Sequence, residues 1–420
     1  MDTKETLGVN YRPRIVDRQL PELLSIAGAV LIEGPRACGK TMTGVNAANS
    51  AIFLDTPQAS LMRETSPELL LEGQVPHLID EWQLFPEIWN QVRRAVDKTP
   101  GRGHFILTGS STPEDDVTRH TGAGRFMRLR MRSETWAEKG FSKGGVTLGD
   151  LFNKADLKPS RNTPSLGEVL EPLAHSGFPA LDDLPPNKSL QMMTSYSEQI
   201  ARTDLQNIAD IRHRPETLTH LMAAIARSLA GDVSLRTLAK DMAPVAPDIT
   251  ADTVGRYLEL LQRLFVVEAI PPWTGKLRSA ARLRRSPKYH LADPALAMAL
   301  LKTNPQKLRK DLETAGLLFE SAVVHDLAVY VEAWGGRIYH YRDSNGNEID
   351  AVLELPDGRW AGVEIKLGGG VATRAAQNLE RVAAIIDAPP PSFLAVITGT
   401  GMSVTLKNGV HTFPLAALGY

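Results

Sequence analysis

The hydrophobic pattern of the first third of the chain alternates between two periods. Short apolar runs of strand type alternate with stretches in which apolar residues recur every three or four positions, as on a helix with one buried face. The strand-like runs lie at residues 29–32, 51–54, 77–81, 104–108 and 126–131, and the helical stretches at 57–72 and 86–98. The last run alternates apolar and charged residues, which is typical of an edge strand. This order predicts an α/β fold with a mainly parallel sheet, covered on both faces, that binds ligands at the carboxyl ends of its strands.

A glycine-containing loop interrupts this pattern directly after the first strand. Its residues are Gly34, Pro35, Arg36, Ala37, Cys38, Gly39, Lys40 and Thr41. The spacing Gly-x-x-x-x-Gly-Lys-Thr between a strand and a helix is that of a loop whose backbone N–H groups surround a polyphosphate. Lys40 is expected to reach the β- and γ-phosphates, and Thr41 to offer its hydroxyl group to Mg²⁺. A turn with an incidental lysine is the alternative, but spacing and context favour a nucleoside triphosphate, with ATP and Mg²⁺ as cofactors.

Two acidic residues end the strand-like run at residues 77–81. Asp80 is expected to hold Mg²⁺ through water, and Glu81 to polarise the water that attacks the γ-phosphate. An acidic loop without a function is the alternative. The phosphate-binding loop on a neighbouring strand favours the catalytic interpretation, because the carboxyl ends of parallel strands meet at one edge of the sheet.

Two further positions are candidates for the same site. The strand at residues 104–108 is followed by hydroxyl groups that could touch the γ-phosphate or its water, or simply form a turn. These belong to Thr108, Ser110 and Ser111. Arg125 precedes the strand at 126–131, and it either reaches the γ-phosphate of a neighbouring subunit or forms a surface salt bridge.

Composition narrows the class of protein. The chain of 420 residues can form two to four domains, and its 43% hydrophobic and 23% charged residues are ordinary for a soluble globular protein. The net charge of −1 provides no overall basic field, so any site for nucleic acid or membrane must be local. We find no apolar run that approaches the length of a membrane span and no signal-peptide core, and therefore expect a cytoplasmic protein without a membrane partner.

The single cysteine, Cys38, excludes an internal disulfide bond and a cysteine-based zinc cluster. It lies in the phosphate-binding loop beside a lysine and a helix start, which both favour the thiolate. Cys38 is therefore either a reactive thiol whose modification blocks ATP binding, or a small buried residue.

The middle of the chain changes character twice. Residues 140–190 are rich in Gly, Ser, Pro and Lys and predict a connector with one or two short helices, and residues 190–228 are mostly helical. Between residues 232 and 292, a helix capped by Ser234, a proline-containing turn and a second helix precede two strand-like segments at 265–270 and 289–291, an order typical of a winged helix. The basic loop of this region contains Lys276, Arg278, Arg282, Arg284, Arg285 and Lys288. This loop contacts nucleic-acid phosphates or is merely solvated, and winged helices also mediate protein contacts.

A second group of charged residues lies on a predicted helix and a predicted β-meander after residue 316. Glu320 falls on an otherwise apolar helical face, where a buried carboxylate needs a partner such as a metal ion. Asp350 lies on the second strand of the meander, and Glu364 and Lys366 share one face of the third strand because they are two positions apart. The carboxylates could hold Mg²⁺ or Mn²⁺, and Lys366 could orient or deprotonate a bound water.

The N-terminal motifs resemble those of a known family. These motifs are Tyr11-Arg12-Pro13-Arg14, the loop at 34–41, Leu78-Ile79-Asp80-Glu81, residues 106–110 and Gly124-Arg125. They are similar to the AAA-type ATPase module of a large bacterial and archaeal group whose C-terminal region ends in a restriction-endonuclease-like fold. The resemblance implies that Ser110 occupies the sensor position, that Arg125 is a candidate arginine finger, and that the protein forms a homo-oligomer or binds a partner protein.

The C-terminal carboxylates and Lys366 resemble the PD-(D/E)xK nuclease core, so a DNA or RNA partner is expected. Together the resemblances imply an ATPase domain at residues 1–140, a connector with helical and winged-helix-like parts at 141–315, and a nuclease-like α/β domain at 316–420.

Our first hypothesis is an ATPase coupled to a nuclease-like domain. The second is an ATP-switched scaffold or regulator with an inactive nuclease fold. A small-molecule kinase is a third, which the downstream regions and the lack of a recognisable acceptor pocket disfavour.

Overall fold

The computed structural model describes residues 11–111, 122–205, 213–231, 233–275 and 286–420. The chain divides into two compact units. Unit 1 consists of Met1–Ser133 with Arg263–Phe265, and unit 2 of Glu134–Gln262 with Val266–Tyr420. The sequence predicts boundaries near residues 140 and 315. The division into units has one main boundary, between residues 133 and 134, and the predicted middle and C-terminal regions lie together in unit 2.

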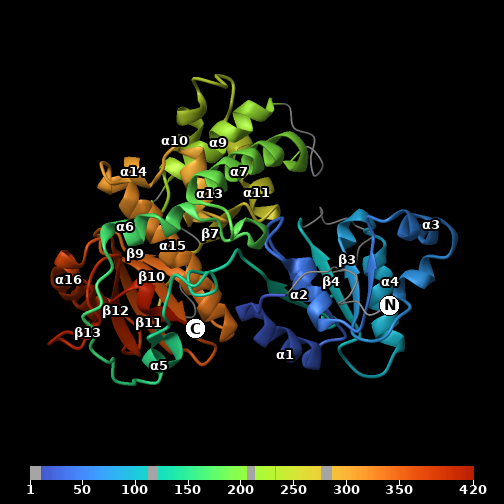
Figure 1. Cartoon of the computed structure of the whole chain (residues 1–420), viewed down its shortest axis with the longest axis horizontal. Helices are drawn as coiled ribbons and strands as arrows, with labels where there is room; N and C mark the ends of the chain where they lie inside the picture. Colours follow the sequence, from blue (N-terminus) through green and yellow to red (C-terminus); the bar gives the residue numbers. More distant parts are fainter. Residues whose placement is uncertain (1–10, 112–121, 206–212, 232, 276–285) are drawn as a thin grey trace. The chain divides into compact units, whose positions relative to one another are not determined.

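Unit 1 is built around a five-stranded parallel sheet with the strand order β2-β3-β4-β1-β5 (Figure 1). Its strands are β1 (Ala29–Glu33), β2 (Ser50–Phe53), β3 (His77–Asp80), β4 (Phe105–Gly109) and β5 (Phe126–Arg130). The α/β class with a parallel sheet is therefore confirmed. Strand β5 lies at an edge, as its alternating sequence predicts, and β3, β4 and β1 are neighbours, so their carboxyl ends meet at one place.

Helices cover both faces of this sheet. Successive side chains of a strand point to opposite faces, so each face packs against its own helices. Leu31, Ile79 and Leu107 belong to one core cluster together with residues of α3 and α4. On the other face, Gly44 of α2 packs against Leu78. The helices are α1 (Gln19–Ile26), α2 (Lys40–Ala47), α3 (Pro57–Thr65) and α4 (Ile88–Lys98). The sheet edge that carries the phosphate-binding loop is thus fixed by packing on two sides.

The first part of unit 2 is mainly helical. Its elements are β6 (Val146–Thr147), α5 (Leu148–Phe152), α6 (Leu166–Leu170), α7 (Pro186–Gln199) and α9 (Pro215–Arg227). The connector predicted at residues 140–190 contains α5 and α6, each five residues long, which agrees with the expected one or two short helices. Most of the connector is irregular but ordered against the rest of unit 2, since β6 pairs with a strand at the end of the chain.

The segment with the predicted winged-helix order contains α10 (Leu235–Met242), α11 (Ala251–Arg263), β7 (Val267–Ile270) and β8 (Lys288–Leu291). Ser234 caps α10, because its hydroxyl accepts a hydrogen bond from the Thr237 amide at 3.1 Å. Strands β7 and β8 pair antiparallel, so the predicted strand pairing is confirmed. The basic residues Lys276, Arg278, Arg282, Arg284 and Arg285 lie outside the described residues. Two short helices follow, α13 (Pro294–Leu300) and α14 (Pro305–Leu308).

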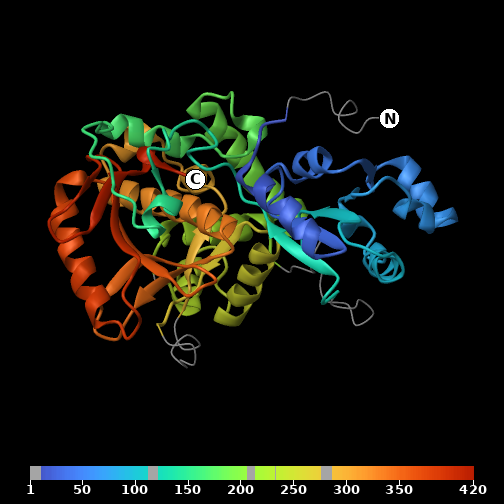
Figure 2. The ribbon, with the colours of Figure 1, turned by 90° about the horizontal axis from the view of Figure 1, so that it is seen from below.

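The last part of unit 2 has a six-stranded sheet with the order β13-β14-β12-β11-β10-β9. Strands β9 (Arg337–Arg342), β10 (Glu348–Glu354) and β11 (Trp360–Lys366) form the predicted antiparallel meander. The chain then crosses through α16 (Ala372–Ile385), which the sequence analysis missed, to β12 (Phe393–Thr398), which pairs parallel to β11. The remaining strands of this sheet are β13 (Val404–Thr405) and β14 (His411–Pro414), while β15 (Leu418–Gly419) pairs with β6. Figure 2 shows α16, in red, running beside this sheet.

Helix α15 (Leu312–Ala333) precedes the meander and lies in the core of unit 2. Among the described residues it is the one helix long and apolar enough to cross a bilayer, which corrects the expectation that no run has this length. Its most apolar window is, however, 78% buried inside the protein. The apolar character of α15 is therefore explained by its place in the core.

Candidate functional site

The backbone of residues 34–39 turns tightly between β1 and α2. A Cβ atom at Gly34 would lie 2.0 Å from the carbonyl oxygen of Met131, so this close approach requires glycine. Gly39 has φ +105°, in the left-handed region that glycine adopts most readily. Both glycines of the motif are thus required by the backbone, and the free N–H groups at the start of α2 are available to an anion.

Lys40 lies inside this loop. Its ammonium group donates hydrogen bonds to the carbonyl oxygens of Gly34 at 3.0 Å and Pro35 at 2.8 Å, and the residue is 5% exposed. Arg36 and Ala37 form the exposed outer part of the turn, where Ala37 adopts φ +66°. The positive charge therefore lies at the centre of the loop, where the sequence predicts phosphate.

The side chains of Thr41 and Asp80 meet at the carboxyl edge of the sheet. The Thr41 and Thr108 hydroxyl groups donate hydrogen bonds to the Asp80 carboxylate, the latter at 2.5 Å. Burial raises the pKa of Asp80, and these hydrogen bonds partly oppose the rise. A hydroxyl and a buried carboxylate side by side are hard oxygen donors that fit Mg²⁺. The predicted metal-binding pair is thus brought together, with Thr108 as an additional partner.

Glu81 adopts an unusual backbone conformation with φ +57°, and its amide donates to the Thr108 hydroxyl at 3.1 Å. The Gln83 amide group donates to the Glu81 carboxylate and, at 3.3 Å, to the Ser110 hydroxyl. Ser110 itself lies 3.5 Å from the Glu81 carboxylate. Glu81 and Ser110, predicted from different strands, therefore lie together. Gln83 also belongs to this group, although the sequence did not predict it. The one hint in the sequence is a polar amide between the apolar residues Trp82 and Leu84.

Arg125 lies apart from this cluster. It precedes β5, whose first residue pairs with the first residue of β1, so it is at the amino edge of the parallel sheet rather than at the carboxyl edge. Its guanidinium group pairs with Asp97 at 2.8 Å and its side chain is 43% exposed. The structure thus shows the surface salt bridge, while the finger role in a neighbouring subunit stays a prediction.

Of the two alternatives predicted for Cys38, the structure favours the small buried residue. The residue is fully buried, and its thiol lies 3.6 Å from the Met131 carbonyl oxygen. A maleimide cannot reach it while the loop keeps this conformation. Cys38 therefore acts as a small residue that packs the phosphate-binding loop.

The second group of predicted residues lies in unit 2 on the expected elements: Glu320 on α15, Asp350 on β10, and Glu364 and Lys366 on β11. The Lys366 ammonium group lies 2.8 Å from Glu364 and 3.5 Å from Asp350. Asp350 also accepts a hydrogen bond from the Ile365 amide at 2.8 Å. The carboxylates of neighbouring strands therefore share one lysine.

A further lysine, Lys288 on β8, completes this charged cluster. Its ammonium group lies 3.3 Å from Glu320 and 2.6 Å from Glu348, and the side chain is 2% exposed. The prediction that Lys288 belongs to the basic loop, in contact with nucleic-acid phosphates or solvated, is wrong, because Lys288 is buried on β8. Because Lys288 begins a buried strand, its charge is used inside the protein. Its only sequence signal is its place next to the apolar Tyr289-His290-Leu291 run.

Burial and neighbouring charges shift the pKa values of this cluster. Burial, followed by the neighbouring Asp350 charge, raises the pKa of Glu320 to about 8 and that of Glu364 to about 7. Burial lowers the pKa of Lys288, but the surrounding carboxylates outweigh this effect and raise it. With every group ionised, four carboxylates face two ammonium groups, so a divalent cation would neutralise the excess charge.

The cluster nevertheless lacks the geometry of a preformed metal site. Among the described residues, no group of three or more His, Cys, Asp or Glu side chains is arranged to hold a metal ion. The two lysines lie between the carboxylates and hold them in pairs. The carboxylates are thus chemically suited to Mg²⁺ or Mn²⁺, but in this structure their partners are the two lysines.

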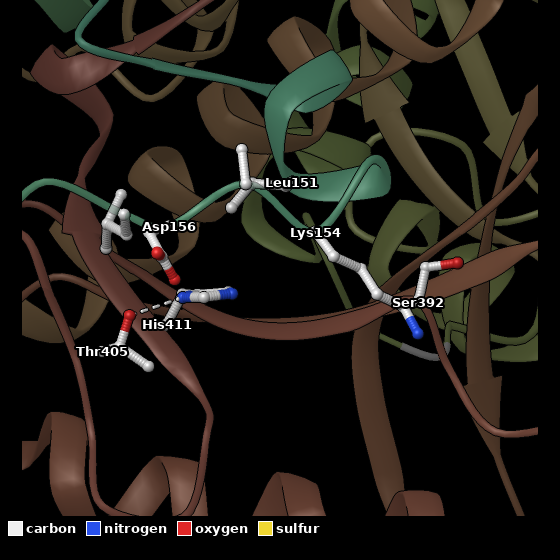
Figure 3. A pocket seen from close by; sticks show the side chains of 8 residues that line it. Leu151, Lys154, Asp156, Ser392, Thr405 and His411 are labelled. Carbon is white, nitrogen blue, oxygen red and sulfur yellow. Dashed lines mark hydrogen bonds between the residues drawn. The ribbon is translucent and has the colours of Figure 1, made fainter.

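A separate cavity of about 440 Å³ lies in unit 2 and contains none of the predicted site residues. Figure 3 shows Lys154 and Asp156 on one side of it, and His411 hydrogen-bonded to Thr405. Burial lowers the pKa of His411, with Asp156 opposing the shift.

Three segments of the chain match families of known proteins. Residues 27–138 match an AAA domain, residues 168–307 match the domain of unknown function DUF8612, and residues 315–418 match the domain of unknown function DUF4143. Uncharacterized proteins of Mycobacterium tuberculosis and Mycobacterium bovis are each 25% identical over 354 residues, which are 83% of this chain and 72% of the relative.

Two solved structures share similarity with the chain. A Walker-type ATPase of Pyrococcus abyssi has a TM-score of 0.39 at 13% identity, covering 69% of this chain and 96% of the other. AMPPCP-bound DnaA from Aquifex aeolicus has a TM-score of 0.23 at 16% identity, covering 59% and 86%. The match of residues 27–138, together with the loop that holds Lys40 and the adjacent Thr41 and Asp80, supports a P-loop ATPase domain of the AAA type that binds ATP.

Proposed function

We propose that unit 1 hydrolyses Mg²⁺-ATP and that this reaction controls a nuclease-like site in unit 2 that binds or cuts DNA or RNA. One observation carries the first half of the proposal. Lys40 and Thr41 come from the start of α2 and Asp80 from the end of β3, and together they surround the position proposed for the β- and γ-phosphates and their metal ion.

Each residue of the unit 1 site has its own role in the proposed hydrolysis. Lys40 binds the phosphates and the N–H groups of the loop surround them. Thr41 and Asp80 would hold Mg²⁺, which neutralises charge on the phosphate oxygens. Glu81 orients and polarises the attacking water, and Ser110 touches the γ-phosphate. Arg125 acts only if the protein forms a homo-oligomer, because its own sheet edge faces away from the loop.

The order of elements supports the nuclease-like half. Helix α15, the antiparallel strands β9, β10 and β11, helix α16 and the parallel strand β12 follow the plan of the restriction-endonuclease fold that the sequence resembles. Asp350 and Glu364, with Glu320, would hold Mg²⁺ or Mn²⁺, which lowers the pKa of a bound water. Lys366 is placed between two of these carboxylates, where it can orient that water. The winged-helix-like segment would contact nucleic acid or a partner protein.

A second function is an ATP-switched scaffold or regulator with an inactive nuclease-like fold. Lys288 favours it, because a buried ammonium group already pairs with Glu320 and Glu348. A cluster that neutralises part of its own charge can persist without a metal ion. The two functions share the ATPase and differ only in whether unit 2 cuts.

Replacing Lys40 with alanine removes the charge at the centre of the loop. We expect ATP affinity, measured by isothermal titration calorimetry, to fall by about 10- to 150-fold, which is the scale of one charged hydrogen bond. Lys98→Ala, at an exposed lysine of α4, is the control. Normal affinity in the Lys40 variant would refute the phosphate-binding assignment.

Glu81→Gln keeps the shape of the side chain but removes its ability to take a proton. We expect the variant to bind ATP normally while kcat falls by about 10²- to 10⁴-fold, the usual contribution of one general base. Steady-state phosphate release measures kcat, and Glu87→Gln at an exposed position is the control. Near-normal turnover would place the water-polarising role on another residue.

Asp350→Ala and Lys366→Ala are expected to abolish Mn²⁺-dependent cutting of DNA or RNA and to leave ATP hydrolysis unchanged. The reason is that each removes a group of the charged cluster in unit 2 and none in unit 1. Asp357→Ala, in the exposed turn after β10, is the control. If pure wild-type protein cuts neither DNA nor RNA, the nuclease function is lost and the scaffold function remains.

Metal binding to unit 2 is expected to depend on pH. The pKa values of about 8 for Glu320 and about 7 for Glu364 lie above their ordinary values, so both groups hold protons at lower pH and a cation must displace them. Mn²⁺ affinity should therefore rise as the pH increases through these two values and level off above them. Calorimetric titration across this range tests the dependence, and Glu364→Gln should weaken binding and flatten the curve. A flat wild-type curve would contradict the site.

A further inference from the structure

The segment 131–136 has neither helix nor strand structure, yet all six of its residues are buried. Irregular backbone is usually exposed, because buried N–H and C=O groups need hydrogen-bond partners. This segment also contains the boundary between the units, after Ser133. Its first half thus belongs to unit 1 and its second half to unit 2, and each half is bonded within its own unit.

The first half is bonded to the phosphate-binding loop. The Met131 amide donates to the Glu33 carbonyl oxygen at 2.8 Å, and the Met131 carbonyl oxygen occupies the space next to Gly34. The Arg14 guanidinium group donates to the carbonyl oxygens of Cys38 at 2.8 Å and Arg132 at 3.1 Å. Arg14 is only 7% exposed. One planar group therefore joins the phosphate-binding loop to the segment.

Arg14 is itself held in place by its neighbours. Its amide donates to Asp17 at 2.7 Å, and the Tyr11 hydroxyl donates to the same carboxylate at 2.6 Å. Tyr11 also lies 3.0 Å from the Thr43 hydroxyl on α2. Tyr11 thus connects the residues before α1 to α2, the helix that follows the phosphate-binding loop. These hydrogen bonds limit how far Arg14 can move on its own when the loop changes conformation.

The second half of the segment is bonded to the core of unit 2. The Glu134 amide donates to the Gly177 carbonyl oxygen at 2.6 Å, and the Trp136 amide donates to the Asp326 carboxylate at 2.9 Å. Asp326 is fully buried on α15 and also pairs with His325 at 3.1 Å. Glu320, in the charged cluster, lies six residues earlier on the same helix.

We propose that Arg14 is a positioning residue that makes the conformation of segment 131–136 depend on the nucleotide in the phosphate-binding loop, and thereby transmits nucleotide state to α15. The inference rests on the proposed binding of ATP to unit 1. A planar guanidinium group holds two carbonyl oxygens in one fixed geometry. When phosphate draws the loop N–H groups inward, the Cys38 carbonyl turns with them, and either the Arg132 carbonyl follows or one of the two bonds breaks.

Hydrogen exchange of the full-length protein tests this coupling. The amides of Glu134 and Trp136 report on the second half of the segment, and the comparison is between no nucleotide, Mg²⁺-ADP and Mg²⁺-ATP in a Glu81→Gln background. In the presence of ATP we expect their exchange rates to change by about 5- to 150-fold, the range of typical coupling between two sites. The measured quantity is the difference between nucleotide states, which a merely structural residue would not alter.

Arg14→Lys and Arg14→Ala test the role of the guanidinium group. Lysine keeps the charge but cannot hold both carbonyl oxygens in one plane. We expect both variants to bind ATP and to lose the nucleotide-dependent change at the two amides. Arg12→Ala, at an exposed position two residues before Arg14, should keep it. If Arg14→Ala does not fold, Arg14→Lys alone decides.

The outcomes separate the inference from the function on which it rests. If the protein with Arg14 intact binds no ATP, the proposed function of unit 1 fails. If ATP binds and the exchange of the two amides does not change, or changes equally in Arg14→Lys, the coupling through Arg14 is refuted while ATP binding stands.

Discussion

The architecture of unit 1 depends on the close approach between the start of the phosphate-binding loop and the backbone that follows β5. Gly34 lies so near the Met131 carbonyl oxygen that no side chain fits between them. This approach sets where the loop begins, and Gly39 sets where α2 begins. Between these two points the loop has one compact path, which places the Lys40 ammonium group inside it. Because β1 and β3 flank β4, the same sheet brings Asp80 to the loop.

The constraint in unit 2 is electrostatic. Four carboxylates and two ammonium groups come together from β8, α15, β10 and β11, and most of them are buried, which makes each uncompensated charge costly. The pKa values of Glu320 and Glu364 are raised first by burial and then by the Asp350 charge, and the neighbouring lysines only partly oppose these two effects. Proton uptake, a metal ion or a shift of a lysine can each restore the balance. The cluster is therefore sensitive to its surroundings in a way that a fully paired core is not.

Much of unit 1 could be predicted from the sequence, because its signals are local. The strand runs, the loop spacing and the acidic strand end each lie within a few residues, and the parallel sheet follows from their order. Pro67 ended the helix predicted over 57–72 earlier than expected, since it starts a separate 3-10 turn at Pro67–Leu71. Gln83 was not recognised as part of the site, because its contact with Ser110 depends on the fold. Arg14 was missed for the same reason, since its partners Cys38 and Arg132 lie 24 and 118 positions away.

In unit 2 the sequence predicted most of the helices and strands, but not all of the contacts between their side chains. Glu320, Asp350, Glu364 and Lys366 lie on the expected helix and strands, because alternation and helical spacing are local. Helix α16 was missed: its buried face is built largely from alanine, which is a weak hydrophobic signal. The contribution of Lys288 was missed for another reason. Its partners lie 32 and 60 positions further along the chain, so only the folded structure brings them together.

Lys288 also changes what the middle region can be. It comes from β8, within the segment predicted to be a winged helix, yet its charge is needed among the carboxylates of α15 and β10. Burying the Lys288 ammonium group costs free energy, which its ion pairs with Glu320 and Glu348 must offset. The segment that contains β8 is therefore part of the charged cluster and not merely a connection between two domains. The position of β8 therefore helps to determine the charge of the cluster. Any contact that moves β8 would therefore change the ion pairs that Lys288 forms with Glu320 and Glu348.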